Sequence, residues 1–160
     1  MELILLDALL DSGSLLVVLA SLLTVALCVL LHYEVSMILS RRMERSTRSQ
    51  RQRFLTLIFG LLGSHIAQIW AFAATMSLLL DMPGTGEVVG ITAPRFLDFV
   101  YLSAINFTTL GYGDIVPDGP IRFVMGTEAL TGFMLITWSA SLTFLEMQKH
   151  WRTHHPDQDN

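Results

Sequence analysis

The sequence predicts an all-α membrane protein built on three transmembrane helices, and both its composition and its hydropathy pattern support this fold class. Hydrophobic residues make up 52% of the 160 residues and charged residues only 15%, whereas a soluble domain carries roughly a quarter charged residues. The charges are clustered, which leaves three mainly apolar stretches, at 15–39, 54–80 and 121–147. Each is long enough to cross a bilayer, which takes about 20 apolar residues.

A basic segment joins the first two apolar stretches and predicts the orientation of the chain. Residues 40–53 have the sequence SRRMERSTRSQRQR, with almost no apolar side chain. Short basic segments of this kind stay in the cytoplasm. We therefore expect a multi-pass protein of the plasma membrane (the cell inner membrane), with its N-terminus outside, residues 81–120 outside, and its tail, residues 148–160, in the cytoplasm.

The arginines of this basic segment are interpreted as contacts with anionic lipid headgroups. Without interleaved aromatic residues they do not indicate a nucleic-acid site, so we expect no nucleic-acid partner. A voltage sensor needs its arginines within a spanning helix, and neither of the first two stretches has that pattern.

The region between the second and third stretches contains an apolar run that is too short to span a bilayer. Residues 81–95 begin with a part rich in glycine and proline and are expected to form an external surface loop. Residues 96–107, FLDFVYLSAINF, would form about three helical turns. A helix of that length between two spanning helices suits a re-entrant segment, which enters the membrane and returns.

The segment FTTLGYGD, residues 107–114, follows this short helix and cannot itself be helical, because glycine is a poor helix former. Non-helical backbone at membrane depth persists only where it is buried in protein or lines a water-filled path. Glycine accepts positive φ, and a strand whose carbonyls all point to one side needs such residues at alternate positions. Gly111 and Gly113 therefore predict a row of backbone carbonyl oxygens along a pore.

TTLGYGD, residues 108–114, resembles the selectivity filter of the potassium channels. The order of elements is also similar to the pore domain of that family, with an outer helix, an external loop, a pore helix, the filter and an inner helix at 54–80, 81–95, 96–107, 108–114 and 121–147. The resemblance covers residues 54–147. Residues 1–53, which hold the N-terminus, the first helix and the basic segment, lie outside it, so the first helix is expected to be an added peripheral span.

The resemblance implies that K⁺ is the permeant ion and that no other cofactor is needed. The ion-binding residues that it implies are Thr109, Leu110, Gly111, Tyr112 and Gly113. K⁺ would lie against the backbone carbonyls of the first four, and the Thr109 hydroxyl would add the innermost ring. Leu110 replaces the valine that is common in the family. One strand cannot surround an ion, so the resemblance and the geometry together imply a homotetramer in the lipid bilayer.

Residues next to the filter are expected to support it. Thr108 ends the pore helix, whose negative C-terminal end would favour a cation in the central cavity. Asp114 lies at the filter mouth, where a ring of acids would concentrate cations. Glu128 lies in the third stretch, and an ionisable residue there is a functional candidate. It either lies behind the filter and bonds to the pore helix near Ser103 or Asn106, or it faces the cavity.

Two features near the filter depart from the family's pattern. Ile105 stands where some members carry an acid that contacts the outer aspartate. Tyr101 and Phe99 are the nearest aromatic residues, at a place where members often have tryptophans. Both departures concern the stability of the filter and its inactivation.

Candidates for gating lie farther along the third stretch. Gly132 resembles the hinge glycine of the family's inner helix, with close helix packing as the alternative. Ile136, Ala140 and Phe144 repeat at helical spacing. On the resemblance they would face the pore axis, with Phe144 as a hydrophobic constriction, and contact with lipid or a neighbouring helix is the alternative.

Other polar residues lie in the first two stretches. A contact of His32 or His65 with Glu34 could tie the first helix to the pore domain and could sense pH, although plain hydrogen bonding between helices is the simpler interpretation. Cys28, the single cysteine, is expected to be buried and unreactive. The histidines of the tail are interpreted as solvated rather than metal-binding: His150, His154 and His155.

The sequence favours a passive channel over an enzyme. It has no metal-ligand cluster, no nucleophile elbow and no Walker loop, and LGYGD lacks the third glycine of a dinucleotide-binding motif. We expect a potassium-selective ion channel that conducts K⁺ passively through carbonyls from four chains. The alternatives are a non-selective cation channel and a non-conducting structural or regulatory subunit of the membrane.

Overall fold

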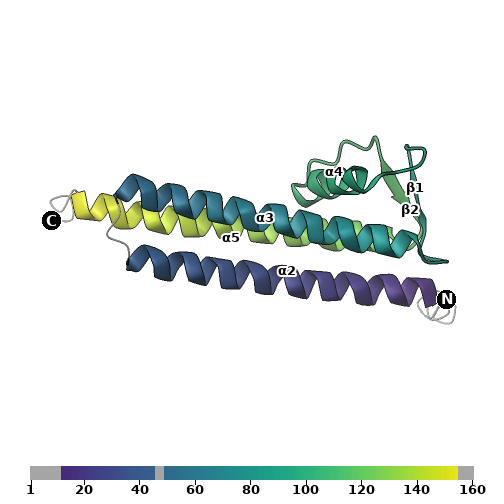
Figure 1. The fold of residues 1–160 in the computed structure, drawn as a ribbon, viewed down its shortest axis with the longest axis horizontal. Helices are drawn as coiled ribbons and strands as arrows, with labels where there is room; N and C mark the ends of the chain where they lie inside the picture. Colours follow the sequence, from purple (N-terminus) through teal and green to yellow (C-terminus); the bar gives the residue numbers. More distant parts are fainter. Residues whose placement is uncertain (1–11, 46–48, 155–160) are drawn as a thin grey trace, which may run out of the picture.

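Three long helices lie side by side and form the body of the molecule (Figure 1). The computed structural model describes residues 12–45 and 49–154, and the parts of the predicted N-terminus, basic segment and tail at 1–11, 46–48 and 155–160 lie outside the described residues. The long helices are α2 (Ser12–Glu44), α3 (Gln50–Leu80) and α5 (Arg122–His154). Helix α2 contacts both α3 and α5.

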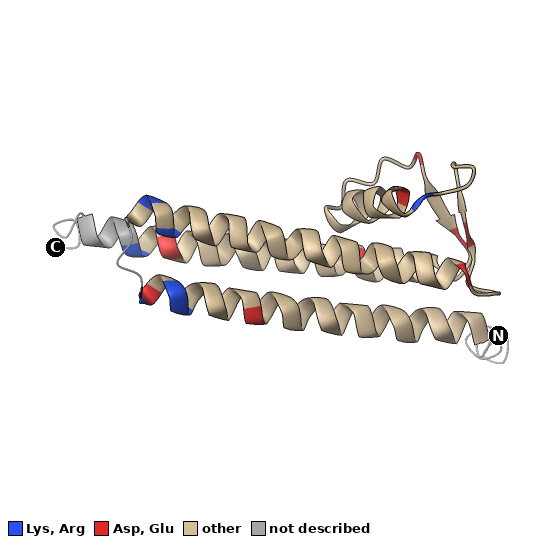
Figure 2. Cartoon of the chain, in the orientation of Figure 1, with Lys and Arg blue, Asp and Glu red and all other residues tan. Residues whose placement is uncertain are grey.

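The three predicted spanning helices are confirmed, and each is apolar and long enough to cross a membrane. Helix α2 has 33 residues and α3 has 31, which corresponds to about 45–50 Å at the helical rise, against a hydrocarbon core of about 30 Å. Figure 2 shows that the blue Lys and Arg residues lie mainly near the end of the bundle where α2 joins α3 and α5 ends, with blue also beside α4 at the other end.

Two of the long helices continue beyond the bounds expected for them. Helix α2 runs to Glu44 and α3 begins at Gln50, so most of residues 40–53, expected to be a loop, is helical. Helix α5 continues to His154 and takes up the first part of the expected tail. The reason is local, because Arg, Gln, Met, Glu and Lys are good helix formers and polar composition alone does not end a helix.

The short helix α4 (Phe96–Phe107) and two short strands lie together at one end of the bundle, opposite the end where α2 joins α3 (Figure 1). The bounds of α4 are those that the sequence predicts. The Arg95 backbone N–H donates to Asp98 Oδ2 at 2.7 Å, which satisfies one of the free groups at the helix start. Thr108 is the C-cap, so the helix ends directly before the predicted filter.

A two-stranded antiparallel sheet lies within the region expected to be irregular. Strand β1 (Glu87–Val89) pairs with β2 (Val116–Asp118), with Val88 opposite Pro117. Glycines with φ of 119° and 103° flank β1, at Gly86 and Gly90. Because β1 precedes α4 and β2 follows the filter segment, the sheet closes the chain around both.

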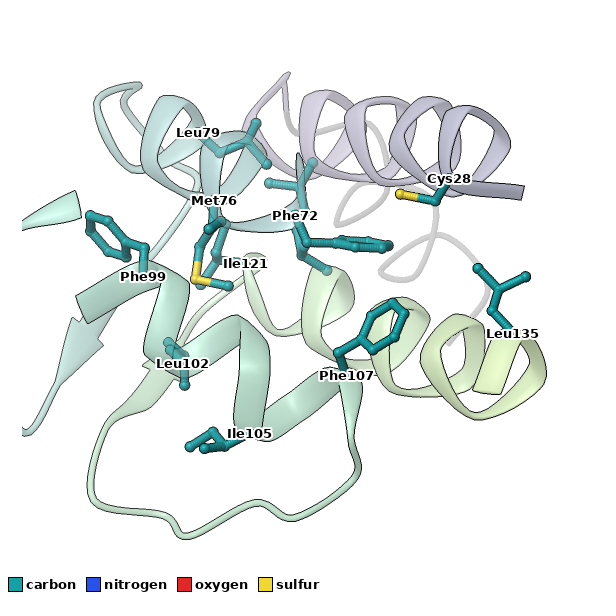
Figure 3. Close-up of a cluster of buried hydrophobic side chains, with 13 residues drawn as sticks. Cys28, Phe72, Met76, Leu79, Phe99, Leu102, Ile105, Phe107, Ile121 and Leu135 are labelled. Carbon is teal, nitrogen blue, oxygen red and sulfur yellow. The ribbon is translucent and has the colours of Figure 1, made fainter. Parts of the chain in front are cut away.

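A cluster of buried apolar side chains holds α4 against the long helices (Figure 3). Phe72 and Met76 come from α3, Leu102 and Phe107 from α4, and all are almost fully buried. Cys28 of α2 lies in the same cluster and is buried, as expected. This packing fixes the position of α4, and therefore the point at which the filter segment leaves it.

Candidate functional site

The predicted filter segment, residues 108–114, leaves α4 through a turn at residues 108–109 and continues as non-helical chain without regular secondary structure. Its φ is positive at alternate residues, 60° at Thr109, 55° at Gly111 and 75° at Gly113. This is the alternation that a row of carbonyls on one side requires. Thr109 is not a glycine, and a threonine at positive φ is uncommon because its branched side chain is strained there. Strain of this kind is concentrated at functional sites.

Hydrogen bonds tie the start of the segment to the end of α4. The backbone N–H groups of Leu110 and Gly111 both donate to the Ile105 carbonyl, at 2.8 and 3.0 Å, and that of Thr109 donates to the Asn106 carbonyl at 2.8 Å. Among the described residues, no group donates to the carbonyl oxygens of residues 109–112. The segment thus uses its N–H groups for anchoring and leaves its carbonyl oxygens free.

The segment is exposed over its whole length in a single chain. Leu110 is 56% exposed and Tyr112 67% exposed, which is unusual for large side chains next to a packed core. A Cβ added at Gly111 or Gly113 would meet no atom of this chain within 4 Å. In one chain the segment therefore lies open on the surface of the molecule.

Glu128 of α5 lies behind the filter segment and is fully buried, with 0% of its surface exposed. Its Oε1 contacts the Ser103 hydroxyl, and its Oε2 accepts a hydrogen bond of 3.1 Å from the Asn106 amide. The same amide donates to the Met125 carbonyl at 2.7 Å. This arrangement matches the hypothesis that Glu128 bonds to the pore helix and not the cavity-facing alternative.

At the other end of the segment, Asp114 accepts a hydrogen bond of 2.9 Å from the Tyr101 hydroxyl. This hydrogen bond to the Asp114 carboxylate raises the pKa of the Tyr101 hydroxyl. Gly90 approaches so closely that a Cβ there would collide with the Asp114 carbonyl oxygen. The aspartate at the predicted mouth is therefore held by α4 on one side and by the residue after β1 on the other.

Gly132 packs directly against the last residue of α4. A Cβ at Gly132 would lie 2.8 Å from both the carbonyl carbon and the ring Cγ of Phe107, and closer still to the Phe107 carbonyl oxygen. This supports close packing as a reason for the glycine. Ile136, Ala140 and Phe144 are all exposed on α5, which fits both the pore-facing alternative and contact with lipid or a neighbouring chain.

A ring of hydrogen bonds joins the three long helices. His65 of α3 contacts Gln68 Oε1 through Nδ1 at 3.1 Å and Ser139 Oγ of α5 through Nε2 at 2.9 Å. His32 of α2 contacts Gln68 Nε2 through Nδ1 at 3.3 Å and Ser139 Oγ through Nε2 at 3.4 Å. The contact of a histidine with Glu34, considered as an alternative, is not formed, because Glu34 is exposed and the histidines bond to these groups instead.

The proton positions in this ring follow from its partners. Gln68 Oε1 only accepts, so His65 Nδ1 carries a proton and its Nε2 accepts from Ser139. Ser139 then accepts from His32 Nε2, and His32 Nδ1 accepts from the Gln68 amide. Within the ring every member donates once and accepts once with both imidazoles neutral, and the Gln68 amide also contacts the Cys28 carbonyl and Ser64 Oγ, so the ring bonds α2, α3 and α5 together. This agrees with the simpler interpretation of these histidines.

Sequence reasoning missed two members of these networks. Ser139 was not singled out, because a serine in an apolar helix more often bonds to its own backbone. Tyr101 was noted only as a nearby aromatic residue. Its position thirteen residues before Asp114 carries no signal until the filter segment turns back beside α4.

Comparison with known protein families gives a match over the pore region of the chain. A family described as "Ion channel" matches residues 54–149, which is more than half of the chain. The matched region begins in α3, includes α4 and the filter segment, and ends in α5. No curated protein and no solved structure matches the chain.

Proposed function

Because the chain belongs to the ion channel family, we propose that it is a potassium-selective channel in which four copies surround one pore. The observation that carries the proposal is the filter segment, with positive φ at alternate residues and unbonded carbonyl oxygens at residues 109–112. Four such rows would form successive oxygen cages. Carbonyl oxygens in rings replace the hydration shell of K⁺ in the filters that this segment resembles.

The proposed path of the ion uses the groups next to the filter. Asp114 from each chain would raise the local cation concentration at the mouth. The carbonyls of residues 109–112, with the Thr109 hydroxyl, would then exchange with water around the ion. At the other end of the filter, the C-terminal ends of the four α4 helices would favour a cation in the cavity. K⁺ is the transported ion here, and conduction follows its gradient.

The homotetramer is proposed because one chain leaves the filter segment open. Leu110 and Tyr112 are more than half exposed, and neighbouring copies would cover them. We place the filter on the outside and the joined ends of α2 and α3 in the cytoplasm, since the basic residues gather at that end. We propose the plasma membrane as the location, with the N-terminus outside.

A non-selective cation channel is the second candidate. The Tyr112–Gly113–Asp114 end favours potassium selectivity, on the resemblance of TTLGYGD to potassium filters. The hydrogen bond of Tyr101 to Asp114 also favours a held, well-defined mouth. A non-conducting subunit has no use for strained backbone at Thr109.

The test is ion flux through purified protein in liposomes. We expect a reversal potential that follows the K⁺ gradient and is insensitive to Na⁺. Gly111→Ala should abolish the flux because its φ of 55° disfavours any side chain. Gly63→Ala is the matched control, since Gly63 lies within α3 and a Cβ there meets nothing within 4 Å. A reversal potential that follows Na⁺ equally would support the second candidate, and no flux from a folded assembly would support the third.

A further inference from the structure

Glu128 is an acid in a site that offers no positive charge. Its side chain is fully buried, and its hydrogen-bond partners, Ser103 and Asn106, are neutral. No ion pair among the described residues includes it. An ionised carboxylate in such a place loses its water without gaining a counter-charge, which is strongly unfavourable.

The packed helices offer few other ionisable groups. Cys28 of α2 is a buried free thiol. His65 of α3 is engaged with Gln68 and Ser139. Tyr101 of α4 is engaged with Asp114. None of these groups donates to Glu128.

The protons of the neighbouring side chains can be assigned one by one. The Ser103 hydroxyl lies 2.8 Å from the Ile69 carbonyl oxygen and also contacts Glu128 Oε1. A hydroxyl has one proton and a carbonyl can only accept, so Ser103 donates to Ile69. The contact between Ser103 Oγ and Glu128 Oε1 then needs a proton from the carboxyl group itself.

The second carboxyl oxygen fits the same assignment. The Asn106 amide has two N–H groups, and they donate to the Met125 carbonyl at 2.7 Å and to Glu128 Oε2 at 3.1 Å. Oε2 is therefore the accepting oxygen and Oε1 carries the proton. With this choice, each of these polar groups has a partner of the right kind, whereas an ionised Glu128 would leave the Ser103 and Ile69 oxygens facing each other without a proton.

We propose that Glu128 is a neutral carboxylic acid at neutral pH and that, in this form, it is a positioning residue for the filter. Asn106 donates to Glu128, Glu128 to Ser103, and Ser103 to Ile69, so one chain of bonds joins α5, α4 and α3. The proton on Glu128 holds α4 against both long helices directly behind the segment that α4 anchors. At alkaline pH, loss of this proton removes the donor to Ser103 and leaves a charge, so the support of α4 weakens.

The direct test is difference infrared spectroscopy on the purified assembly. We expect a carboxylic-acid carbonyl band at neutral pH that is absent in Glu128→Gln and disappears from the wild type as the pH rises. In Ser103→Ala the band should shift, because the acid loses the acceptor of its proton. If the neutral-pH spectra of wild type and Glu128→Gln differ only by an ionised carboxylate, the proposal is overturned.

A stability profile separates positioning from simple packing. Glutamine can donate to Ser103 and accept from Asn106 through its amide, so Glu128→Gln keeps both bonds without a proton to lose. We expect the thermal stability of the wild type to fall as the pH rises and that of Glu128→Gln to stay flat over the same range. Equal profiles would overturn the positioning role.

The effect on the filter rests on the proposed function and is measured separately. Potassium flux at neutral pH tests the channel, and the infrared band tests the proton. An infrared band without any flux would support the protonated Glu128 and refute the channel. Flux without the band would support the channel and refute the protonated Glu128. With both present, the flux of the wild type should decline at alkaline pH in parallel with the band.

Discussion

Replacing Gly132 with alanine would test whether α4 depends on close contact with α5. The added methyl group would lie 2.8 Å from the carbonyl carbon and ring Cγ of Phe107, and nearer to its carbonyl oxygen. These are closer than ordinary van der Waals contacts, which begin at about 3.5 Å between carbon atoms. Most of the obstruction is backbone, which cannot rotate away, so α4 must move to accommodate the change.

Two opposing effects set the magnitude. Overpacking of a well-packed site costs about 1–3 kcal/mol, whereas replacing glycine by alanine within a helix gains about 1 kcal/mol. Gly126 lies in the same helix, and a Cβ there meets nothing within 4 Å of this chain. Gly126→Ala therefore carries only the gain, and we expect Gly132→Ala to be less stable than this control by about 1–3 kcal/mol.

The assay is the free energy of unfolding in mixed micelles, together with potassium flux of both variants. Flux of Gly132→Ala should fall with stability, because movement of Phe107 shifts the start of the filter segment. Equal stability of the two variants would refute the packing argument. If stability were equal but opening changed, the alternative of a hinge at Gly132 would be favoured.

Three further changes test other contacts. Ser139→Ala should lower the free energy of unfolding by about 1–3 kcal/mol, because it leaves imidazole nitrogens of the ring without partners. The double variant with Gln68→Leu should lose less than the sum of the two single losses, since both residues belong to one ring, and additive losses would contradict the ring. Tyr101→Phe removes the hydrogen bond to Asp114, so potassium flux should be lost at a lower temperature than in the wild type while helicity by circular dichroism is retained. If flux were lost at the same temperature in both, the bond would not support the mouth of the proposed filter. Gly90→Ala places a Cβ against the Asp114 backbone at a φ of 103°, so the melting temperature should fall, and an unchanged value would mean that this turn tolerates a side chain.

The sequence was sufficient for the elements whose signals are local. The bounds of α4 follow from an apolar run that starts after Pro94 and ends before the glycine-bearing segment. The alternating positive φ follows in part from Gly111 and Gly113, whereas Thr109 shows no such preference of its own. The three spans follow from their apolar length, but their ends do not, because polar good helix formers such as those near Glu44 continue the helix.

The contacts between elements could be predicted only where few partners were available. Glu128 in an apolar helix needs polar partners, and the short helix offered Ser103 and Asn106. The ring through Ser139 depends on how α2, α3 and α5 are rotated about their axes, and no local pattern records that rotation. The pairing of β1 with β2 likewise requires segments separated by all of α4 to meet in register.

Helix α2 lies outside the family match, yet it supplies hydrogen-bond partners to a buried polar side chain of the matched region. Gln68 is fully buried and directs its amide toward the Cys28 carbonyl and His32, both on α2. Trimming the chain to residues 54–149 would remove both of these acceptors, so that the Gln68 amide would face hydrocarbon with Ser64 as its remaining acceptor. Helix α2 thus supplies polar partners to the region that matches the family, and a shortened version of this protein would have to replace Gln68 as well as remove the helix.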